Sequence, residues 1–388
     1  MSDSNPDYIA LYEKELQGDF YGADYYRPPR SAIDSAIIYD DGEDKRTMAA
    51  FIALNFAPNR VLEAGCAMGL LVKALRGRGV EAEGFDFSRW CIDTAHPQAK
   101  PWVCWGDILE LKPPVRPYDM VLAIDILEHL PPEKVPLAIE NLVAALARNG
   151  ILLAIVPAYG SNAFGPELYP LQYEEWRRDA ALRIPFRNIP LDDRGRPHLG
   201  HLTHATIPWW VDKFRGRGLL RLGKVERLLH HRFDSALEFP RRSFFVFVKS
   251  RGWGGWRVSR RLLKRIGEVP GLPQGFFEWE RWGEDLWMRW TSASAWDPVE
   301  VRGRSELKLR AICNHPGIGE NPVRVSFRID HADPVIVEFR DHDWHAVSLK
   351  LPARRFAALG IQCSRTWVPE PDLPEGLRRE LGVGISFP

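Results

Sequence analysis

The sequence lacks several features that would tie it to a membrane, to secretion or to a polyanionic partner. Its N-terminal stretch has no basic region followed by an apolar one, and no apolar run is long enough to span a bilayer. Charge of neither sign is in excess, since 52 basic residues face 51 acidic ones and the formal net charge is +1. We therefore expect a cytoplasmic protein with no membrane span and no nucleic-acid partner.

Cysteine is scarce as well. The five cysteines are scattered and none belongs to a C-x-x-C pair: Cys66, Cys91, Cys104, Cys313 and Cys363. This spacing argues against both a disulfide framework and a zinc site built from cysteines, and it agrees with a reducing compartment. We predict no metal among the site residues.

The common glycine patterns for phosphate binding are also absent. The segment RVLEAGCAMGLLVKAL, residues 60–75, runs from an apolar strand through two glycines into a helix. Gly65 and Gly69 are four residues apart, which fits neither G-x-G-x-x-G nor G-x-x-x-x-G-K-[ST]. A turn that leads into a helix N-terminus still suits a nucleotide-like ligand, so the identity of that ligand has to come from other residues.

Apolar strands alternate with helices over the first part of the chain. A helix is expected from about Asp44 to Phe56, and strands are expected at 60–64, 80–87, 102–107, 118–125, 150–158 and 244–250, with helices at 70–79 and 131–150 between them. Strands that alternate with helices predict an α/β fold with a Rossmann-like, doubly wound and mostly parallel sheet. We assign this domain to residues 1–250.

The composition changes after residue 250. Residues 251–275 are basic and helix-like between glycine- and proline-rich ends, which predicts a linker. Beyond them, short strands follow closely, and in NPVRVSFRID the apolar Val323, Val325 and Phe327 alternate with polar residues. This period of two predicts an all-β sandwich domain over residues 276–388. We expect most of the 15 tryptophans to lie in cores.

Acidic residues stand at the ends of four predicted strands: Glu63, Asp86, Asp107 and Asp125. The carboxyl ends of parallel strands line the ligand crevice of such sheets. Asp86 follows Gly65 by 21 residues, the offset at which an acidic side chain receives ribose hydroxyls. Carboxylates at several strand ends disfavour a pyrophosphate and suit a ligand with a ribose, an adenine, an amino group and a sulfonium. S-adenosylmethionine has all of these.

At these positions the sequence resembles the class I S-adenosylmethionine-dependent methyltransferases of the type 11/12 kind, over roughly residues 46–250. VLEAGCAMG resembles their glycine-rich motif, with Ala67 in place of the middle glycine, while GFDFS resembles the ribose loop and GDI the adenine turn. YDMVLAIDILEHL and NGILLAIVP resemble the fourth motif and fifth strand. The resemblance implies a methyltransferase whose cofactor-binding residues are Glu63, Gly65, Cys66, Ala67, Gly69, Asp86, Phe87, Asp107, Ile108 and Asp125.

Two of these residues have structural alternatives. For Asp107 the alternative is a cap on the turn that follows it. Cys66 has no adjacent base, so we interpret it as a small buried spacer and not as a nucleophile.

A hydroxyl acceptor would need a base to take its proton. The fourth motif lacks the [DNS]-P-P-[YFW] and Pro-Cys patterns of enzymes that methylate nucleobases. Related methyltransferases carry a GH segment over the active site, and GHLTH stands there in this chain, so His201 is the first candidate for the base and His129 the second. His129 has the alternative of a packing residue. The spacing of His198, His201 and His204 leaves a metal site as another alternative, although magnesium prefers oxygen ligands.

The region from Phe276 to Phe387 is similar to a small β-sandwich attached to enzymes of bacterial surface-polysaccharide synthesis, on the markers W-x-R-W-T, R-T-W-x-P and L-G-V. This resemblance implies an O-methyltransferase that acts on a sugar of a surface glycan or of its precursor. A methyltransferase of a small molecule (quinone, phenol or natural product) and a catalytically silent glycan-binding or scaffold protein remain alternatives. The C-terminal domain would then bind glycan, dock to a partner or form a homodimer.

Overall fold

The computed structural model describes residues 10, 12, 20–26, 43–161, 169–193, 195–237, 244–250, 253–282, 286–372 and 378–387. The chain divides into two compact units. The first comprises residues 1–40, 58–72 and 80–264, and the second comprises residues 41–57, 73–79 and 265–388. The expected boundaries at residues 250 and 276 stay a prediction.

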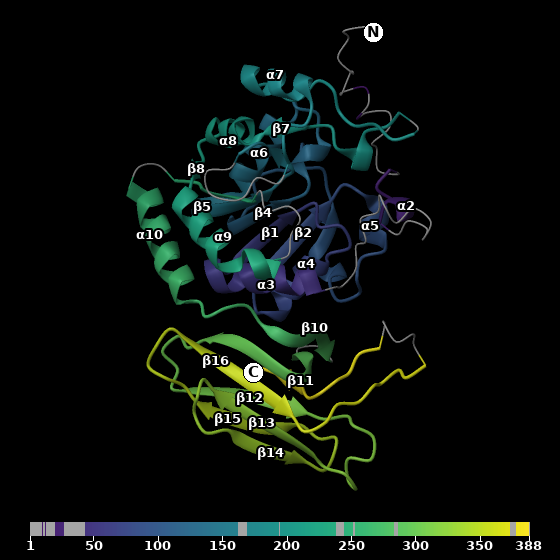
Figure 1. Ribbon diagram of the computed structural model, residues 1–388, viewed down its shortest axis with the longest axis vertical. Coiled ribbons are helices and arrows are strands. Elements are labelled where there is room, and N and C mark those ends of the chain that lie inside the picture. Colours follow the sequence, from purple (N-terminus) through teal and green to yellow (C-terminus); the bar gives the residue numbers. More distant parts are fainter. Residues whose placement is uncertain are drawn as a thin grey trace. The chain divides into compact units, whose positions relative to one another are not determined.

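A seven-stranded sheet organises the first unit (Figure 1). Its strands lie in the order β3 (Val103–Trp105), β2 (Glu81–Asp86), β1 (Arg60–Ala64), β4 (Tyr118–Ile124), β5 (Leu146–Ile155), β9 (Phe244–Val248) and β8 (Leu220–Arg221). The strands from β3 to β5 pair in parallel, and β9 is antiparallel to both of its neighbours. The predicted Rossmann-like α/β fold is confirmed.

Helices flank this sheet, which explains why its central strands are apolar on both faces. The helices of the first unit are α2 (Ala23–Tyr26), α5 (Arg89–Asp93), α6 (Val135–Ala145), α7 (Glu174–Leu182), α8 (Ile207–Arg215) and α9 (Gly223–Leu237). Helix α4 (Leu70–Gly77) and helix α10 (Trp253–Glu268) each contribute residues to both units. The helix expected within 251–275 is therefore present.

The parallel register brings the strand ends that matter for function to one edge. Ala64, the last residue of β1, pairs with Phe85 of β2 and with Ala123 of β4. The residues that follow these three strands therefore lie side by side, as the sequence predicts for the acidic strand ends.

The second unit contains helix α3 (Glu43–Phe56) and an antiparallel sheet. The strands of this sheet are β10 (Gln274–Trp282), β11 (Leu286–Glu300), β12 (Glu306–Ile312), β13 (Val323–Ile329), β14 (Val335–Phe339), β15 (His345–Lys350), β16 (Phe356–Cys363) and β17 (Gly384–Ser386). Along β13, buried and more exposed residues alternate as predicted. The all-β character of this region is confirmed.

The eight strands form one hydrogen-bonded sheet, in contrast to the two separate sheets of a simple sandwich. Strands β13 and β15 are not neighbours in that sheet, yet Val325 of β13 and Val347 of β15 belong to the same buried core. The sheet therefore curls over and encloses its apolar face.

Two further observations concern expectations from composition. All five cysteines are free thiols. In the part of the chain that the structure describes, no helix has both the length and the apolar character needed to cross a membrane.

Candidate active site

The glycine turn follows β1 directly. Gly65 and Gly69 have φ values of +72° and +77°, in the region that favours glycine. A β-carbon at Gly65 would lie 2.8 Å from Ile126 Cδ1, and one at Gly69 would lie 2.8 Å from Ala99 Cβ. Both glycines are therefore required by conformation and by space.

Ala67, which replaces the middle glycine of the family pattern, has a φ of +45°. The sequence predicts that this replacement costs little because alanine is small. The structure shows that the backbone conformation matters as well as size, since a non-glycine residue in this region is strained by about 1 kcal/mol or more.

The backbone N–H groups of this turn are already used within the protein. Those of Gly65 and Cys66 both donate to Phe85 O, at 2.9 and 3.0 Å, and that of Gly69 donates to Cys66 O at 2.8 Å. The N–H of Ala67 donates to Asp86 Oδ2 at 2.7 Å. These four groups are not available to a phosphate, which agrees with a ligand that lacks one.

Asp86 is buried and accepts one backbone hydrogen bond on each carboxylate oxygen. Besides the bond from Ala67, the N–H of Ser88 donates to Oδ1 at 2.8 Å. Burial raises the pKa of this carboxyl, while the two backbone bonds oppose the rise. Because an ionised carboxylate has about four acceptor positions, it could still receive ribose hydroxyls. Asp86 thus joins β2 to the glycine turn whether or not a ligand is bound.

Cys66 has the environment of a packing residue. Its side chain is fully buried, and a β-carbon at Gly84 would lie 2.6 Å from Cys66 Cβ. Burial raises the pKa of its thiol well above the ordinary value, and Glu63 and Asp86 nearby add to the rise. A thiol held neutral is a poor nucleophile, so the spacer interpretation fits this geometry.

The other predicted cofactor residues occupy different settings. Glu63 is buried at the end of β1, and Asp125 follows β4 with a φ of +50°. Asp107 Oδ1 accepts a hydrogen bond from the N–H of Leu109 at 2.8 Å, which is the capping alternative. Ile108 is buried in the core cluster of the sheet, so its side chain serves packing.

Phe87 contributes its backbone to the same edge. Its carbonyl oxygen accepts a hydrogen bond from Trp105 Nε1 at 2.8 Å. This bond links the residue after β2 to the end of β3.

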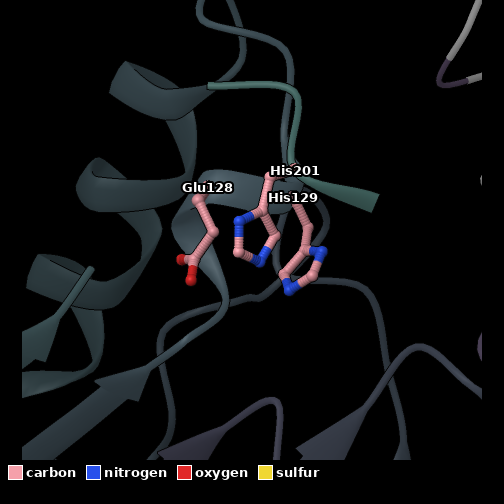
Figure 2. Close-up of side chains that lie close together, drawn as sticks. All are labelled: Glu128, His129 and His201. Atoms are coloured by element: carbon pink, nitrogen blue, oxygen red, sulfur yellow. The ribbon is translucent and has the colours of Figure 1, made fainter. Parts of the chain in front are cut away.

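Both histidine candidates lie in one cluster with Glu128. One ligand atom from each of Glu128, His129 and His201 lies within 4.8 Å of the other two. The rings of His129 and His201 have centroids 4.9 Å apart and are nearly perpendicular, at 82°. Figure 2 shows the imidazole of His201 between the Glu128 carboxylate and the ring of His129. Glu128 and His201 are buried, so the pair lies where electrostatic interactions are strong.

Backbone hydrogen bonds bring these distant segments together. The carbonyl oxygen of Glu128 accepts from the N–H groups of Leu202 and Thr203, at 2.8 and 2.9 Å. The Thr203 hydroxyl donates to Leu130 O at 2.6 Å. The segment that carries His201 is thereby fixed against the short helix η3 (Leu127–His129), which follows β4.

The partners of His129 bear on where its ring proton lies. Nδ1 lies 3.2 Å from Gly200 O and 3.1 Å from the Tyr21 hydroxyl. A carbonyl oxygen can only accept, so the contact with Gly200 O requires a proton on Nδ1 if it is a hydrogen bond. Tyr21 thus takes part in orienting the ring.

Comparison with known proteins bears on this arrangement. Residues 41–218 match the sequence model of a family described as a methyltransferase domain. The chain carries a methyltransferase domain. Its cofactor is S-adenosylmethionine.

Several solved structures are similar in fold to this methyltransferase at low sequence identity. The amino pentose methyltransferase CalS10 from Micromonospora echinaspora is 15% identical, with a TM-score of 0.38, and the match covers 58% of this chain and 98% of that one. The [4+2]-cyclase SpnF is 14% identical, with a TM-score of 0.35 and coverage of 59% and 86%.

An O-methyltransferase family protein from Burkholderia thailandensis is 13% identical, with a TM-score of 0.34. The match covers 53% of this methyltransferase and 55% of that protein, so it spans about half of the latter's length. No curated protein sequence gives a significant match.

His198 and His204 lie in the same segment as His201, and the ring centroid of His204 lies 5.9 Å from that of His201. His204 Nδ1 lies 2.9 Å from the Tyr159 hydroxyl, and burial lowers the pKa of His204 to about 4. His198 is exposed. The alternative metal site made of His198, His201 and His204 is therefore not assembled among the described residues.

A different set could hold a metal ion. Within the described part of the chain, Glu128, His129 and His201 are the one such group of three. Two imidazoles and a carboxylate suit zinc or a similar transition metal better than magnesium.

Sequence reasoning did not assign two residues of this site. Glu128 adjoins His129, and its position in LEH, next to a candidate base, was a usable signal. Tyr21 lies in a tyrosine-rich segment, but its contact with His129 spans 108 residues, and no local pattern indicates it.

Proposed function

We propose that this methyltransferase transfers a methyl group to a hydroxyl of a sugar, in a bacterial surface glycan or its precursor, with His201 as the base. The observation that carries the O-methyl assignment is the cluster of Glu128, His129 and His201 at the end of β4. A hydroxyl nucleophile requires removal of a proton, and a neutral imidazole is the side chain best suited to accept it near neutral pH.

The roles follow from the geometry of the cluster. S-adenosylmethionine, when bound, supplies an electrophilic methyl group on a sulfonium, and Glu63, Asp86 and the glycine turn are the residues that would hold it. His201 would accept the proton of the acceptor hydroxyl, and the bond from that oxygen to the methyl carbon would form as the methyl–sulfur bond breaks and S-adenosylhomocysteine leaves. The Glu128 carboxylate stabilises the imidazolium that results, as an acidic partner does in other histidine bases.

The acceptor class has separate support. It comes from the resemblance of residues 276–387 to a domain attached to enzymes of surface-polysaccharide synthesis. The cluster itself would serve equally for a phenol or another small hydroxyl compound, so the acceptor has to be identified by experiment.

The decisive experiment incubates the full chain with labelled S-adenosylmethionine and candidate acceptors, followed by mass spectrometry. Sugar-containing precursors should gain one methyl group on oxygen. His201→Ala should lower turnover by about 10²–10⁴-fold, the usual contribution of a general base, while cofactor binding measured by calorimetry stays near that of the native chain. His198→Ala, an exposed histidine close by in the sequence, is the matched control and should retain full activity.

Other outcomes would redirect the assignment. Loss of turnover in His129→Ala but not in His201→Ala would move the base role to His129. Loss of activity after addition of a chelator, with recovery on addition of zinc or manganese, would indicate that the cluster acts through a metal. Full activity in both histidine variants would remove the base assignment. Methylation of a quinone or phenol but of no sugar would replace the acceptor class, and failure with all acceptors would favour a binding or scaffold role.

A further inference from the structure

The second unit contains a pocket that methyl transfer does not use. Its volume is about 660 Å³, within the range of small-molecule sites. It is lined by residues of helix α3, of the end of helix α4 and the turn after it, of the end of helix α10 and of the antiparallel sheet with its connections, and all of these lining residues belong to this unit. None of the proposed cofactor or base residues belongs to this unit.

Positive charge predominates around the pocket. Five arginines line it, and only two carboxylates do: Arg76, Arg78, Arg265, Arg302 and Arg304 against Asp297 and Glu300. This leaves a formal surplus of three positive charges. Such a surplus in a concave site favours an anionic ligand.

Each of the two carboxylates is shared between guanidinium groups. Glu300 forms a two-point pair with Arg265, at 2.7 and 3.0 Å, and also accepts from Arg302 Nε at 2.9 Å. One carboxylate thus faces two cations, and the local charge stays positive.

The other carboxylate repeats this arrangement. Asp297 pairs with Arg78, at 3.4 Å, and with the buried Arg289. Burial, together with the charge of Arg78, lowers the pKa of Arg289 to about 10, although Asp297 opposes the change. Burial is the larger cause of this lowering, and the neighbouring guanidinium adds to it.

Aromatic side chains supply the other kind of surface. Trp279, Trp287 and Phe387 line the same pocket. Sugar rings carry apolar C–H faces that pack on aromatic rings, and guanidinium groups bind phosphate or carboxylate through paired N–H donors. The combination of both surfaces in one pocket is selective for a ligand that has both features.

We propose that this pocket binds an anionic saccharide, that is, a sugar ring that carries a phosphate or a carboxylate. Arg302 and Arg304 lie at its exposed part and contact the anionic group. The aromatic side chains contact the ring. This proposal concerns a second site and does not rest on the identity of the methyl acceptor.

The test uses calorimetry on the full chain with four probes. Glucose 1-phosphate and glucuronate are the phosphorylated and carboxylated sugars, and glucose and inorganic phosphate are the controls. At least one anionic sugar should bind at least tenfold more tightly than either control, with an affinity that falls as salt is raised. Equal binding of inorganic phosphate would overturn the saccharide assignment, and equal binding of glucose would overturn the role of charge.

Variants connect that binding to this pocket. The double variant Arg302→Ala/Arg304→Ala should weaken the anionic sugar at least tenfold, because it removes two exposed cations while Arg265 remains paired with Glu300. Arg310→Ala, an exposed arginine of β12 that does not line the pocket, should change the affinity less than twofold. Binding unchanged in the double variant, or absent in the native chain, would overturn the proposal. Arg304→Gln repeats the test if the double variant does not fold.

Discussion

Asp86 illustrates how one side chain can serve structure and ligand together. Its carboxylate already holds the N–H groups of Ala67 and Ser88, so the glycine turn has its shape before any ligand arrives. Preorganisation of this kind lowers the entropic cost of binding. Removal of the carboxylate should therefore affect the turn as well as any contact to a ribose.

We expect Asp86→Ala to weaken S-adenosylmethionine by about 1–3 kcal/mol, because it leaves buried donors without their acceptor and removes the proposed ribose contact. Calorimetry on the full chain measures the change. Asp93→Ala, an exposed aspartate in helix α5, is the control and should bind as the native chain does. An affinity in Asp86→Ala equal to that of the control would contradict the assignment.

At the scale of elements, the contact between helix η3 and the segment around His201 decides the site. The backbone N–H groups of Leu202 and Thr203 and the Thr203 hydroxyl donate the hydrogen bonds that hold this contact. Donor and acceptor are far apart in the sequence, as they are in the neighbouring contact between His129 and Gly200, which spans 71 residues. The position of His201 relative to Glu128 therefore depends on bonds that His201 itself does not make.

Thr203→Val tests this dependence. The variant keeps the shape of the side chain but loses the bond to Leu130 O, which should cost about 1–3 kcal/mol of unfolding free energy. We expect a lower kcat with cofactor binding unchanged, since His201 would be less well positioned. Thr94→Val, which removes a similar hydroxyl-to-carbonyl bond in an exposed turn, should leave kcat unchanged. A similar kcat in both variants would argue against positioning by Thr203.

His204 gives the same region a dependence on pH. Burial lowers its folded-state pKa from the ordinary 6.5 to about 4. As pH falls through this interval, the unfolded chain binds the proton first, so the folded state loses stability that it has in full above pH 6.5. The loss between pH 7 and pH 4.5 amounts to about 2 kcal/mol from this group.

Urea unfolding at the two pH values measures that loss. His204→Gln should reduce the difference between pH 7 and pH 4.5 by about 2 kcal/mol, because glutamine does not titrate. His331→Gln removes an exposed histidine of the second unit and should leave the difference unchanged. An equal pH dependence in the native chain and in His204→Gln would show that His204 does not titrate as inferred.

At the scale of the whole molecule, each of the two compact units is made of segments that are not continuous in the sequence. Helix α3 and the end of helix α4 belong to the unit of the β domain, although the sequence places them within residues 1–250. The end of helix α4 packs closely on strand β10, since a β-carbon at Gly77 would lie 2.3 Å from Trp279 Cγ. Arg265 adds a hydrogen bond to Leu54 O at 2.6 Å.

The prediction that the two domains are separable can be examined with a fragment of residues 1–250. It should bind S-adenosylmethionine, because every proposed binding residue lies in the first unit. Its Tm should be lower than that of the full chain, because helix α3 and the end of helix α4 lose packing partners such as Trp279. Calorimetry and thermal unfolding measure both properties. A soluble fragment without cofactor binding would make the β domain part of the catalytic unit.

The sequence by itself predicted the main strands of both regions, the helices α3, α4, α6 and α10 and the acidic strand ends, while it placed the end of α6 at residue 150, where the structure already has β5 from Leu146. These follow from local rules, namely the period of apolar residues and the parallel alternation of strands and helices. They place Glu63 and Asp86 near the ends of their strands and Asp125 directly after its strand, without any knowledge of packing. The sequence also predicted the glycine turn, because glycine is the residue that adopts a positive φ at little cost.

Only the tertiary structure decided which side chains meet. It joined His201 to Glu128 and His129 in one group that could hold a metal ion, left His198 and His204 out of that group, and grouped the five arginines around one pocket. It also revealed the strained backbone of Ala67. These features depend on hydrogen bonds and packing between segments far apart in the chain, and such contacts leave no periodic signal in the sequence.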